Sequence, residues 1–292
     1  MNKSFQNILE LNLSILFIST SGALGRYIDL PVPLTIGLRA LIAAIFIFLF
    51  CKWKRFDLNI QRRDILIIVF SGVLMGLHWI TYFYALKMSN VAIGMISLFT
   101  YPVITSFLEP LILKVRFQKI QILFGLLVLA GIYLLVPDFD LKNNYSIALV
   151  LGIMSAVFYS LRNIFTKSNV STYNGSVLMF YQLIVIAIIL SPFSVLIEIP
   201  QVVSQIPSIL LLAIVTTTIG HTWFIYSLGK FSTTSVSIMS SAQPIYGIII
   251  GVIFLQELPE FNAILGGLII LSTVVLESYR TYKKTRPIVD II

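Results

Sequence analysis

Two short stretches of this sequence combine histidine with aromatic residues. The first contains His78, Trp79 and Tyr82, and the second contains His221, Trp223 and Tyr226. Residues four apart share one face of a helix, so the rings of His78 and Tyr82 are expected to point the same way. Such a face can hold an amphipathic solute by stacking, cation–π contacts and hydrogen bonds. The same residue types also anchor helices at membrane interfaces or pack in cores, and the sequence leaves these alternatives open.

Charged side chains interrupt the apolar sequence at Arg39 and Glu109. Arg39 follows Pro33 by about 9 Å along a helix, so its side chain could reach an interface, pack, or contact an anion. Glu109 is a candidate for attracting a cationic substrate group or a proton at the mouth of a pathway. Its alternative role is a structural salt bridge to a nearby Lys or Arg. Arg26 and Arg162 lie closer to the ends of apolar runs and are expected to extend to the polar interface.

The composition explains why these charges matter. The chain is 58% hydrophobic and 11% charged, with a mean hydropathy of +0.97, whereas soluble proteins carry about 25% charged residues. Helices of about 20 apolar residues cross a bilayer, and continuous runs of this length exclude a transmembrane barrel. The sequence therefore predicts an all-α polytopic membrane protein with ten spans, near residues 8–28, 33–51, 64–86, 91–113, 120–136, 146–166, 176–197, 208–229, 233–255 and 261–279.

Basic and acidic residues separate into alternate loops of this arrangement. Lys and Arg gather in the loops that share a side with the N-terminus, whereas Asp29, Glu198 and Glu257 fall in the others. The positive-inside rule then predicts cytoplasmic N- and C-termini in the cytoplasmic membrane. The net charge of +8 reflects topology and contact with membrane lipid and does not indicate nucleic-acid binding. A single cysteine, Cys51, excludes an intrachain disulfide, and no pattern indicates a metal or a cofactor.

An internal repeat relates the two halves of the chain. The stretch GLHWITYFYALKMSNVAIGM, from Gly76, aligns with GHTWFIYSLGKFSTTSVSIM, from Gly220, so that Trp79 matches Trp223. Each half contains five predicted spans, an odd number, so the halves enter the membrane from opposite faces and are inverted. The predicted repeats cover residues 1–137 and 138–280, followed by a short basic cytoplasmic tail at 281–292.

The repeat also pairs two prolines inside predicted spans, Pro102 and Pro244. Each proline removes the hydrogen bond to the carbonyl four residues earlier. That carbonyl must then be satisfied by protein or by cavity water. Interrupted helices at matching positions of two inverted repeats indicate the central site of a carrier. We therefore expect both prolines to bend their helices beside a cavity, and the adjacent side chains that we expect on the substrate pathway are those of Tyr101, Ser240 and Gln243.

The paired stretches ALKMSNVAIGMISLFTYPV and SLGKFSTTSVSIMSSAQPI, with FLQELPEFNAILGGLIIL near the end, resemble the EamA branch of the drug/metabolite transporter superfamily. The resemblance covers residues from about 8 to 280. It implies a ten-helix secondary carrier, commonly an exporter of amino acids or other small metabolites, with its substrate cavity between the two halves. The position of the first repeat that corresponds to Glu257 is occupied by Arg116. The two repeats of this chain therefore do not share an acidic residue at this position.

The predicted function is secondary transport of a small, zwitterionic or amphipathic metabolite by alternating access, with export as the expected direction. An intramembrane enzyme is the first alternative. It would need a metal site or a nucleophile with its base, and the sequence offers only a serine paired with His78 or His221. A channel or a scaffold membrane protein is the second alternative. The sequence does not indicate a substrate, a coupling ion or an oligomeric state.

Overall fold

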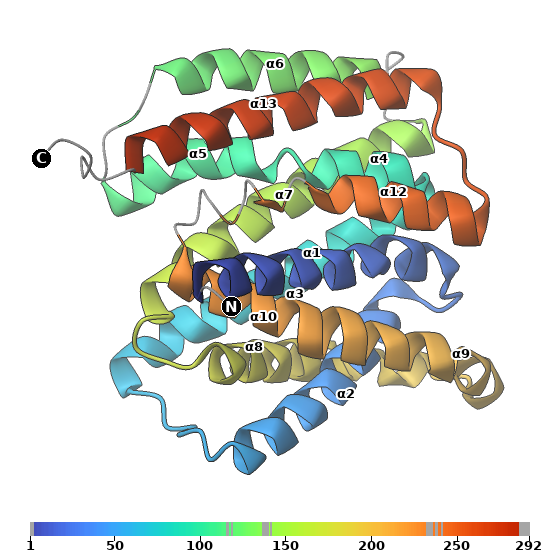
Figure 1. Ribbon diagram of the computed structural model, residues 1–292. Coiled ribbons are helices and arrows are strands. Elements are labelled where there is room, and N and C mark those ends of the chain that lie inside the picture. The colour runs from blue at the N-terminus through green and yellow to red at the C-terminus, as the bar shows by residue number, and fades with distance from the viewer. Residues whose placement is uncertain are drawn as a thin grey trace, which may run out of the picture.

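The computed structural model describes residues 3–114, 117, 119–135, 140, 142–231, 236, 239–240 and 242–285, and each regular element in these ranges is helical (Figure 1). The first half contains α1 (Lys3–Tyr27), α2 (Val32–Trp53), α3 (Arg62–Met88), α4 (Val91–Leu98), α5 (Tyr101–Leu113) and α6 (Ile120–Leu135). The second half contains α7 (Asn144–Asn169), α8 (Gly175–Leu190), η1 (Ser191–Leu196), α9 (Ile199–Leu211), η2 (Leu212–His221), α10 (Thr222–Lys230), α12 (Ala242–Leu255) and α13 (Phe261–Thr285). The predicted repeat boundary at 137–138, the start of the predicted span 233–255 and the tail after 285 lie outside the described residues.

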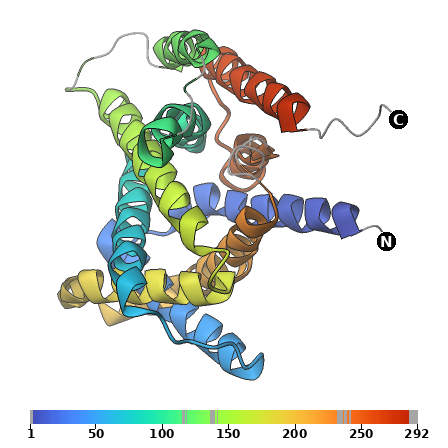
Figure 2. The same ribbon diagram turned by 90° about the vertical axis from the view of Figure 1, so that its left-hand side faces the viewer.

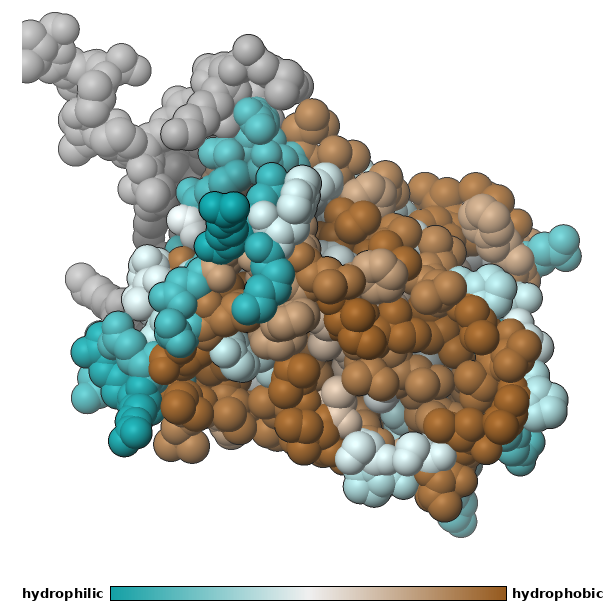
Figure 3. Space-filling view, turned by 90° about the horizontal axis from the view of Figure 1, so that it is seen from below, coloured by the Kyte–Doolittle hydropathy of each residue, from teal (hydrophilic) through white to brown (hydrophobic). Residues whose placement is uncertain are grey.

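The helices provide the membrane spans that the sequence predicts. Within the described residues, seven helical segments are long and apolar enough to cross a membrane, and three apolar helices are shorter. The three shorter ones are Ile122–Leu134, Ala242–Leu255 and Phe261–Thr273. Apolar side chains form a broad band between more polar ends of the molecule (Figure 3). The prediction of an all-helical, multi-pass membrane fold is therefore confirmed.

The packing of the helices repeats when the two halves are exchanged. Helix α1 packs against η2, α10 and α12 of the second half, and its counterpart α7 packs against α3, α4 and α5 of the first. Helices α2 and α8 pack together, and so do α6 and α13, which lie side by side at the edge of the bundle (Figures 1 and 2). The first helix of each half is thus embedded in the other half. This arrangement fits a two-repeat architecture and joins the halves along a long interface.

Contacts near the helix ends agree with alternating spans. The hydroxyl of Tyr173, between α7 and α8, donates a 2.6 Å hydrogen bond to Asp64 at the start of α3. This bond raises the pKa of Tyr173. At the other end of the bundle, Gln201 donates to the carbonyl of Asp29 at 2.9 Å. Each contact joins residues that the ten-span alternation puts on one side of the membrane.

The predicted span 91–113 is two helices rather than one. Asn90 begins α4 by accepting a 2.9 Å hydrogen bond from the backbone N–H of Ile93, a common N-cap contact. Helix α4 ends at Leu98, and α5 begins at Tyr101, one residue before Pro102. Proline is well tolerated in the first turn of a helix because the N–H that it lacks would have no intrahelical partner there. Pro102 therefore marks a helix start, whereas α5 continues through Pro110.

A second departure from a regular span occurs in the segment Ile199–Lys230. Its 32 residues form one continuous helical run, longer than the predicted span 208–229. The middle part, η2, is a π-helix, in which hydrogen bonds join residues five apart. The hydroxyls of Thr217 and Thr218 donate 2.9 Å bonds to the carbonyls of Leu212 and Ala213, also five residues earlier. These threonines therefore support the π-helical geometry.

The break between α4 and α5 lies over a glycine of α7. A Cβ atom placed on Gly152 would lie 2.6 Å from the Cβ of Ser97 and would also meet its Oγ. Ser97 is buried in α4, and its hydroxyl already donates a 2.6 Å hydrogen bond to the carbonyl of Ile93. The short side chain of Ser97 has little freedom to move aside. Gly152 therefore lets α4 and α7 approach closely, as small residues do between membrane helices.

We expect Gly152→Ala to lower the free energy of unfolding by about 1–3 kcal/mol, the usual cost of overpacking a core. The matched control is Gly229→Ala in α10, because the nearest atom to a Cβ there is Val170 Cγ2 at 3.7 Å, an ordinary contact. Denaturant titration of both variants in detergent micelles measures the difference. Equal stability of the two variants would contradict the close approach of α4 and α7.

Candidate functional site

A closed cavity lies in the centre of the bundle. It is small in this closed arrangement, with about 10 Å³ of accessible space, room for about one water molecule, and is lined by Ile18, Ser21, His78, Trp79, Tyr82, Leu98, Phe99, Tyr101, Tyr159, His221 and Gln243. The exposed fraction of each of these side chains is at most 5%. The cavity is therefore sealed from both ends of the bundle, and its lining comes from both halves of the chain.

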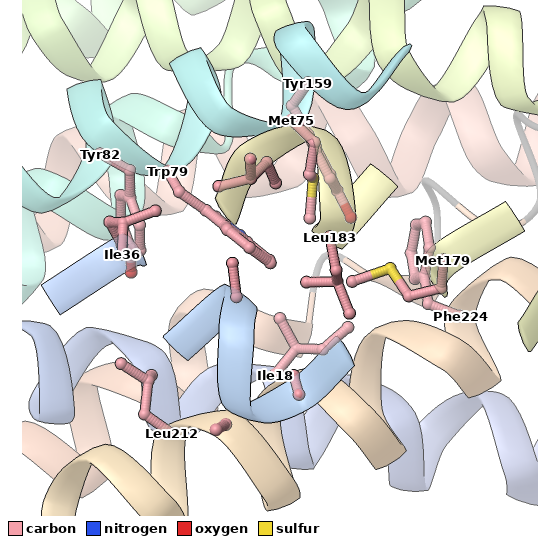
Figure 4. Close-up of a cluster of buried hydrophobic side chains, with 14 of the residues drawn as sticks. Ile18, Ile36, Met75, Trp79, Tyr82, Tyr159, Met179, Leu183, Leu212 and Phe224 are labelled. Atoms are coloured by element: carbon pink, nitrogen blue, oxygen red, sulfur yellow. The ribbon is translucent and has the colours of Figure 1, made fainter. Parts of the chain in front are cut away.

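Six candidates named from the sequence meet at this cavity: His78, Trp79, Tyr82, Tyr101, His221 and Gln243. Helix α3 provides the first three, and Tyr101, His221 and Gln243 come from α5, η2 and α12. Trp79 and Tyr82 point from α3 toward the middle of the bundle (Figure 4). The ring centroids of Trp79 and His221 are 5.4 Å apart, so the two halves meet across this pair.

Tyr159 of α7 is the central aromatic residue that our sequence analysis missed. Its ring stacks on His78 with centroids 4.5 Å apart and meets the ring of Tyr101 edge-on at 5.0 Å. It also lies 6.0 Å from the ring of Phe224. Helical spacing could have indicated this residue. Tyr159 is four residues after the small, polar Ser155 and three before Arg162, so all three lie on one face of α7. These rings form an aromatic wall that spans both halves.

His78 is held in place by Ser155 of α7. Its Nδ1 lies 2.7 Å from Ser155 Oγ, and Ser155 Oγ donates a 2.9 Å hydrogen bond to the carbonyl of His78. Because the serine proton is directed at that carbonyl, the imidazole Nδ1 is assigned as the donor to Ser155 Oγ. The pair fixes the ring orientation and joins α3 to α7. A serine whose proton is already bound in this way is poorly arranged to act as a nucleophile.

Two serines hydrogen-bond to the backbone beside the prolines. Ser160 Oγ of α7 lies 3.0 Å from the carbonyl of Tyr101, and Ser19 Oγ of α1 lies 3.1 Å from the carbonyl of Gln243. Tyr101 and Gln243 directly precede Pro102 and Pro244. Each serine comes from the first helix of the opposite half, so the contacts correspond by repeat. The carbonyls that the prolines free lie four residues earlier, and that of Ser240 accepts a 2.9 Å hydrogen bond from the backbone N–H of Gln243.

The two prolines and Ser240 lie next to the cavity lining. Pro244 and Ser240 are buried, and Pro102 is partly buried. Pro244 is the third residue of α12, so this helix also begins close to its proline. The hydroxyl of Ser240 donates a 2.7 Å hydrogen bond to the carbonyl of Val236 and does not line the cavity. Both prolines therefore stand at helix starts that carry cavity residues, Tyr101 and Gln243.

Arg39 and Arg162 are both fully buried, with exposed fractions of 0%. The Cζ of Arg39 lies 3.7 Å from the ring centroid of Trp79, and its Nε donates a 2.6 Å hydrogen bond to Thr217. Arg162 does not extend to the interface, contrary to expectation. Instead, its Nε and Nη2 donate to Gln182 Oε1 at 3.1 and 2.7 Å. Polar partners inside the bundle make this burial possible, which apolar periodicity alone did not reveal.

Besides Arg39 and Ser240, three further sequence candidates do not line the cavity: Trp223, Tyr226 and Glu109. The ring of Trp223 packs against Phe17 with centroids 5.9 Å apart, and Tyr226 bonds to Ser176 and Asn174. The π-helix η2 directly precedes these residues. It has more residues per turn than an α-helix, and this changes the direction of every later side chain. The residue at the cavity is therefore His221, not Trp223, although Trp223 aligns with Trp79.

Glu109 is partly buried in α5 and interacts electrostatically with Lys167 of α7. Lys167 in turn donates to the carbonyls of Leu228 and Phe231 at the end of α10. Glu109 thus lies near a basic residue, as its alternative role in a structural salt bridge requires. No ion pair within 4 Å involves Glu109 among the described residues. A role for Glu109 at the mouth of a pathway stays a prediction.

Ion pairs connect both ends of α1 to the second half. Arg26 Nε donates to Glu257 Oε1 at 2.9 Å, and Glu257 also accepts from the backbone N–H of Val91 at the start of α4. At the opposite end, Lys230 Nζ lies 2.6 Å from Glu10 Oε2. The cavity residues of α1, Ile18 and Ser21, lie between these two pairs. Both ends of the central cavity are therefore flanked by a contact between the halves.

The sequence was also compared with known proteins. It matches the model of the EamA-like transporter family over residues 8–136 and 146–279. The chain belongs to the EamA-like transporter family. This EamA-like chain is similar to the pseudopaline exporter CntI of Pseudomonas aeruginosa. The identity is 24% over 249 residues in strain UCBPP-PA14 and 22% over 241 residues in strain PAO1, with 82% of this chain and 84% of the relative covered in each case.

A solved crystal structure shares the fold of this EamA-like protein. The two superpose with a TM-score of 0.69 at 15% sequence identity, over 96% of this chain and 99% of the other. The likeness extends over both halves, so the whole bundle has a counterpart of known structure. Together, the family match and the helices identify a multi-pass membrane protein of a transporter family.

Proposed function

We propose that this EamA-like protein is a secondary transporter that exports a small metabolite across the cytoplasmic membrane. Alternating access between its two inverted halves would expose the central cavity first to one side and then to the other. The observation that carries the proposal is the sealed cavity, whose lining residues come from both halves, including His78 and Tyr101 on one side and Tyr159 and His221 on the other. An occluded cavity of this kind suits a carrier better than an open channel.

The lining favours an amphipathic solute. Aromatic rings of Trp79, Tyr82 and Tyr159 provide apolar surface, and His78, His221 and Gln243 add polar atoms. Pockets that bind small molecules combine a largely apolar wall with a few polar groups in this way. The two relatives described above are pseudopaline exporters, which supports export of a metabolite. An enzymatic function receives less support, because the Ser155 hydroxyl that contacts His78 is committed to a backbone carbonyl.

Ion pairs at the ends of α1 suggest how the cavity closes. We assign the Arg26–Glu257 pair to the outer end and the Glu10–Lys230 pair to the inner end, in keeping with cytoplasmic termini. Each pair joins the first half to the second, so opening one end of the cavity requires one pair to separate. The pairs are partly exposed, and such pairs contribute only about 0–1 kcal/mol. Weak closures of this size can open on the timescale of transport.

Counterflow in proteoliposomes tests the transporter directly. The vesicles are preloaded with an unlabelled amino acid or amphipathic metabolite, and uptake of the labelled compound is followed across a panel. We expect saturable exchange for at least one compound and about a fivefold loss with His221→Phe, because a polar contact contributes about 1 kcal/mol. Trp223→Phe is the matched control, since Trp223 lies outside the cavity. A flux that does not saturate would indicate a channel, and protein-dependent product formation would indicate an enzyme.

The orientation can be tested with single cysteines in a Cys51→Ser background. Asn144 at the start of α7 and Asn59 between α2 and α3 are both exposed, and they lie at opposite ends of the predicted spans. An impermeant thiol reagent added to intact cells is expected to modify Asn144→Cys and to spare Asn59→Cys until the membrane is opened. Modification of Asn59→Cys from outside would overturn the proposed orientation.

The closing role of the ion pairs predicts opposite effects on one cavity residue. In the Cys51→Ser background, a cysteine at Ser21 reports whether the cavity is open. We expect Glu257→Gln to increase labelling of Ser21→Cys by an impermeant reagent added outside, by about twofold to fivefold for a contact of up to 1 kcal/mol. Lys230→Gln is expected to increase labelling only in inside-out vesicles. The same response to both substitutions would refute the assignment of the pairs to separate ends.

A further inference from the structure

The guanidinium of Arg39 has fewer partners than a buried charge requires. One hydrogen bond, from Nε to Thr217, and two ring contacts, to Trp79 and to Phe83, hold it. Neither Nη1 nor Nη2 has a hydrogen-bond partner, although both atoms are buried. The three ion pairs among the described residues also do not involve Arg39. A buried cation that lacks a partner is costly, and in membrane proteins such charges usually mark a functional site.

Arg162 shows that this fold can satisfy a buried arginine. Its guanidinium donates to Gln182 through Nε and Nη2 and to Asn163 through Nη1 at 3.0 Å. The side chain of Gln182 is held in turn by Ser71 and Thr166. Arg39 is buried to the same extent and has no comparable set of acceptors. The unpaired donors of Arg39 are therefore a local feature and not a general property of this core.

Arg39 lies directly behind the wall of the central cavity. Trp79, on which it stacks, lines the cavity, and Arg39 also interacts electrostatically with the lining residues Tyr82 and His221. The cavity lining contains no Asp or Glu. The missing anion is thus not supplied by the described residues around the cavity. Two terminal nitrogens on a planar group match the two oxygens of a carboxylate.

We propose that Arg39 is the specificity-determining residue for an anionic group, a carboxylate, on the transported solute. Trp79 holds the guanidinium beside the closed cavity, and opening of the halves lets the carboxylate reach Nη1 and Nη2. The inference rests on the proposed transport function and adds the substrate class. A phosphate of an anionic lipid headgroup has similar chemistry, and the experiment below separates the two sources.

Stability without a solute provides the first test. Arg39→Met replaces the unpaired charge by an apolar side chain of similar length, so the purified variant should keep or raise its melting temperature. The matched control is Arg162→Met, which removes the donors of Gln182 and Asn163 and should lower the melting temperature. An Arg39→Met protein as destabilised as Arg162→Met would show a structural role and overturn the proposal.

Recognition of the carboxylate provides the second test. Proteoliposomes of neutral lipid are assayed for counterflow with matched pairs, such as phenylalanine with phenylalaninamide and phenylpropionate with phenylpropionamide. We expect transport of a carboxylate at least about 30-fold faster than that of its amide, and a similar loss in Arg39→Met, as for one truncated partner of a buried charge pair. Arg39→Lys keeps the charge without the planar fork and should retain an intermediate rate.

The outcomes distinguish this proposal from the broader one. If Arg39→Met exchanges solute as fast as the wild type, or if acids and amides are exchanged at equal rates across the panel, the role of Arg39 is overturned. The proposed transport function would still stand. The absence of protein-dependent exchange for every compound contradicts the proposed transport function itself. If phosphatidylglycerol raises the melting temperature of the wild-type protein but not that of Arg39→Met, and no carboxylate solute raises it, the site binds lipid. This result also overturns the proposal.

Discussion

Polar groups inside a membrane must find their partners within the protein, and this constraint governs the structure of the chain. Helices α5 and α12 begin beside prolines, and each proline removes the hydrogen bond to the carbonyl four residues earlier. The hydroxyls of Ser160 and Ser19 reach the carbonyls of Tyr101 and Gln243 from the opposite half. The segments around both prolines are therefore joined to the opposite half by hydrogen bonds.

The same exchange produces the cavity. Helices α1 and α7 are each embedded in the opposite half, so the residues beside the prolines face side chains from the other repeat. His78, fixed by Ser155, and Tyr101 meet Tyr159 across this interface. A wall built from two bodies can separate without unfolding either one. The interface that joins the halves is thus also the interface that alternating access in a carrier would open.

The two halves share a packing scheme and differ in chemistry. Trp79 stands at the cavity, whereas the aligned Trp223 packs on Phe17, because the π-helix η2 changes the direction of the residues after it. Arg162 donates its hydrogen bonds to Gln182, whereas Arg39 keeps two nitrogens without partners. The packing of the bundle is therefore approximately symmetrical, whereas the residues at its centre are not. Trp79 lines the cavity without a tryptophan opposite it, and Arg39 keeps an unpaired charge behind it.

The sequence by itself determined the elements and their order. Apolar runs of span length, the repeat around Trp79 and Trp223, and the matched Pro102 and Pro244 were sufficient to predict a helical membrane protein with two related halves. These features are local, since they depend on hydropathy and on residue type at fixed spacing. Only the tertiary structure decided which side chains meet. Tyr159 reached the cavity, Trp223 and Tyr226 did not, and Arg162 was buried, because these outcomes depend on helix rotation and on partners more than 15 residues away.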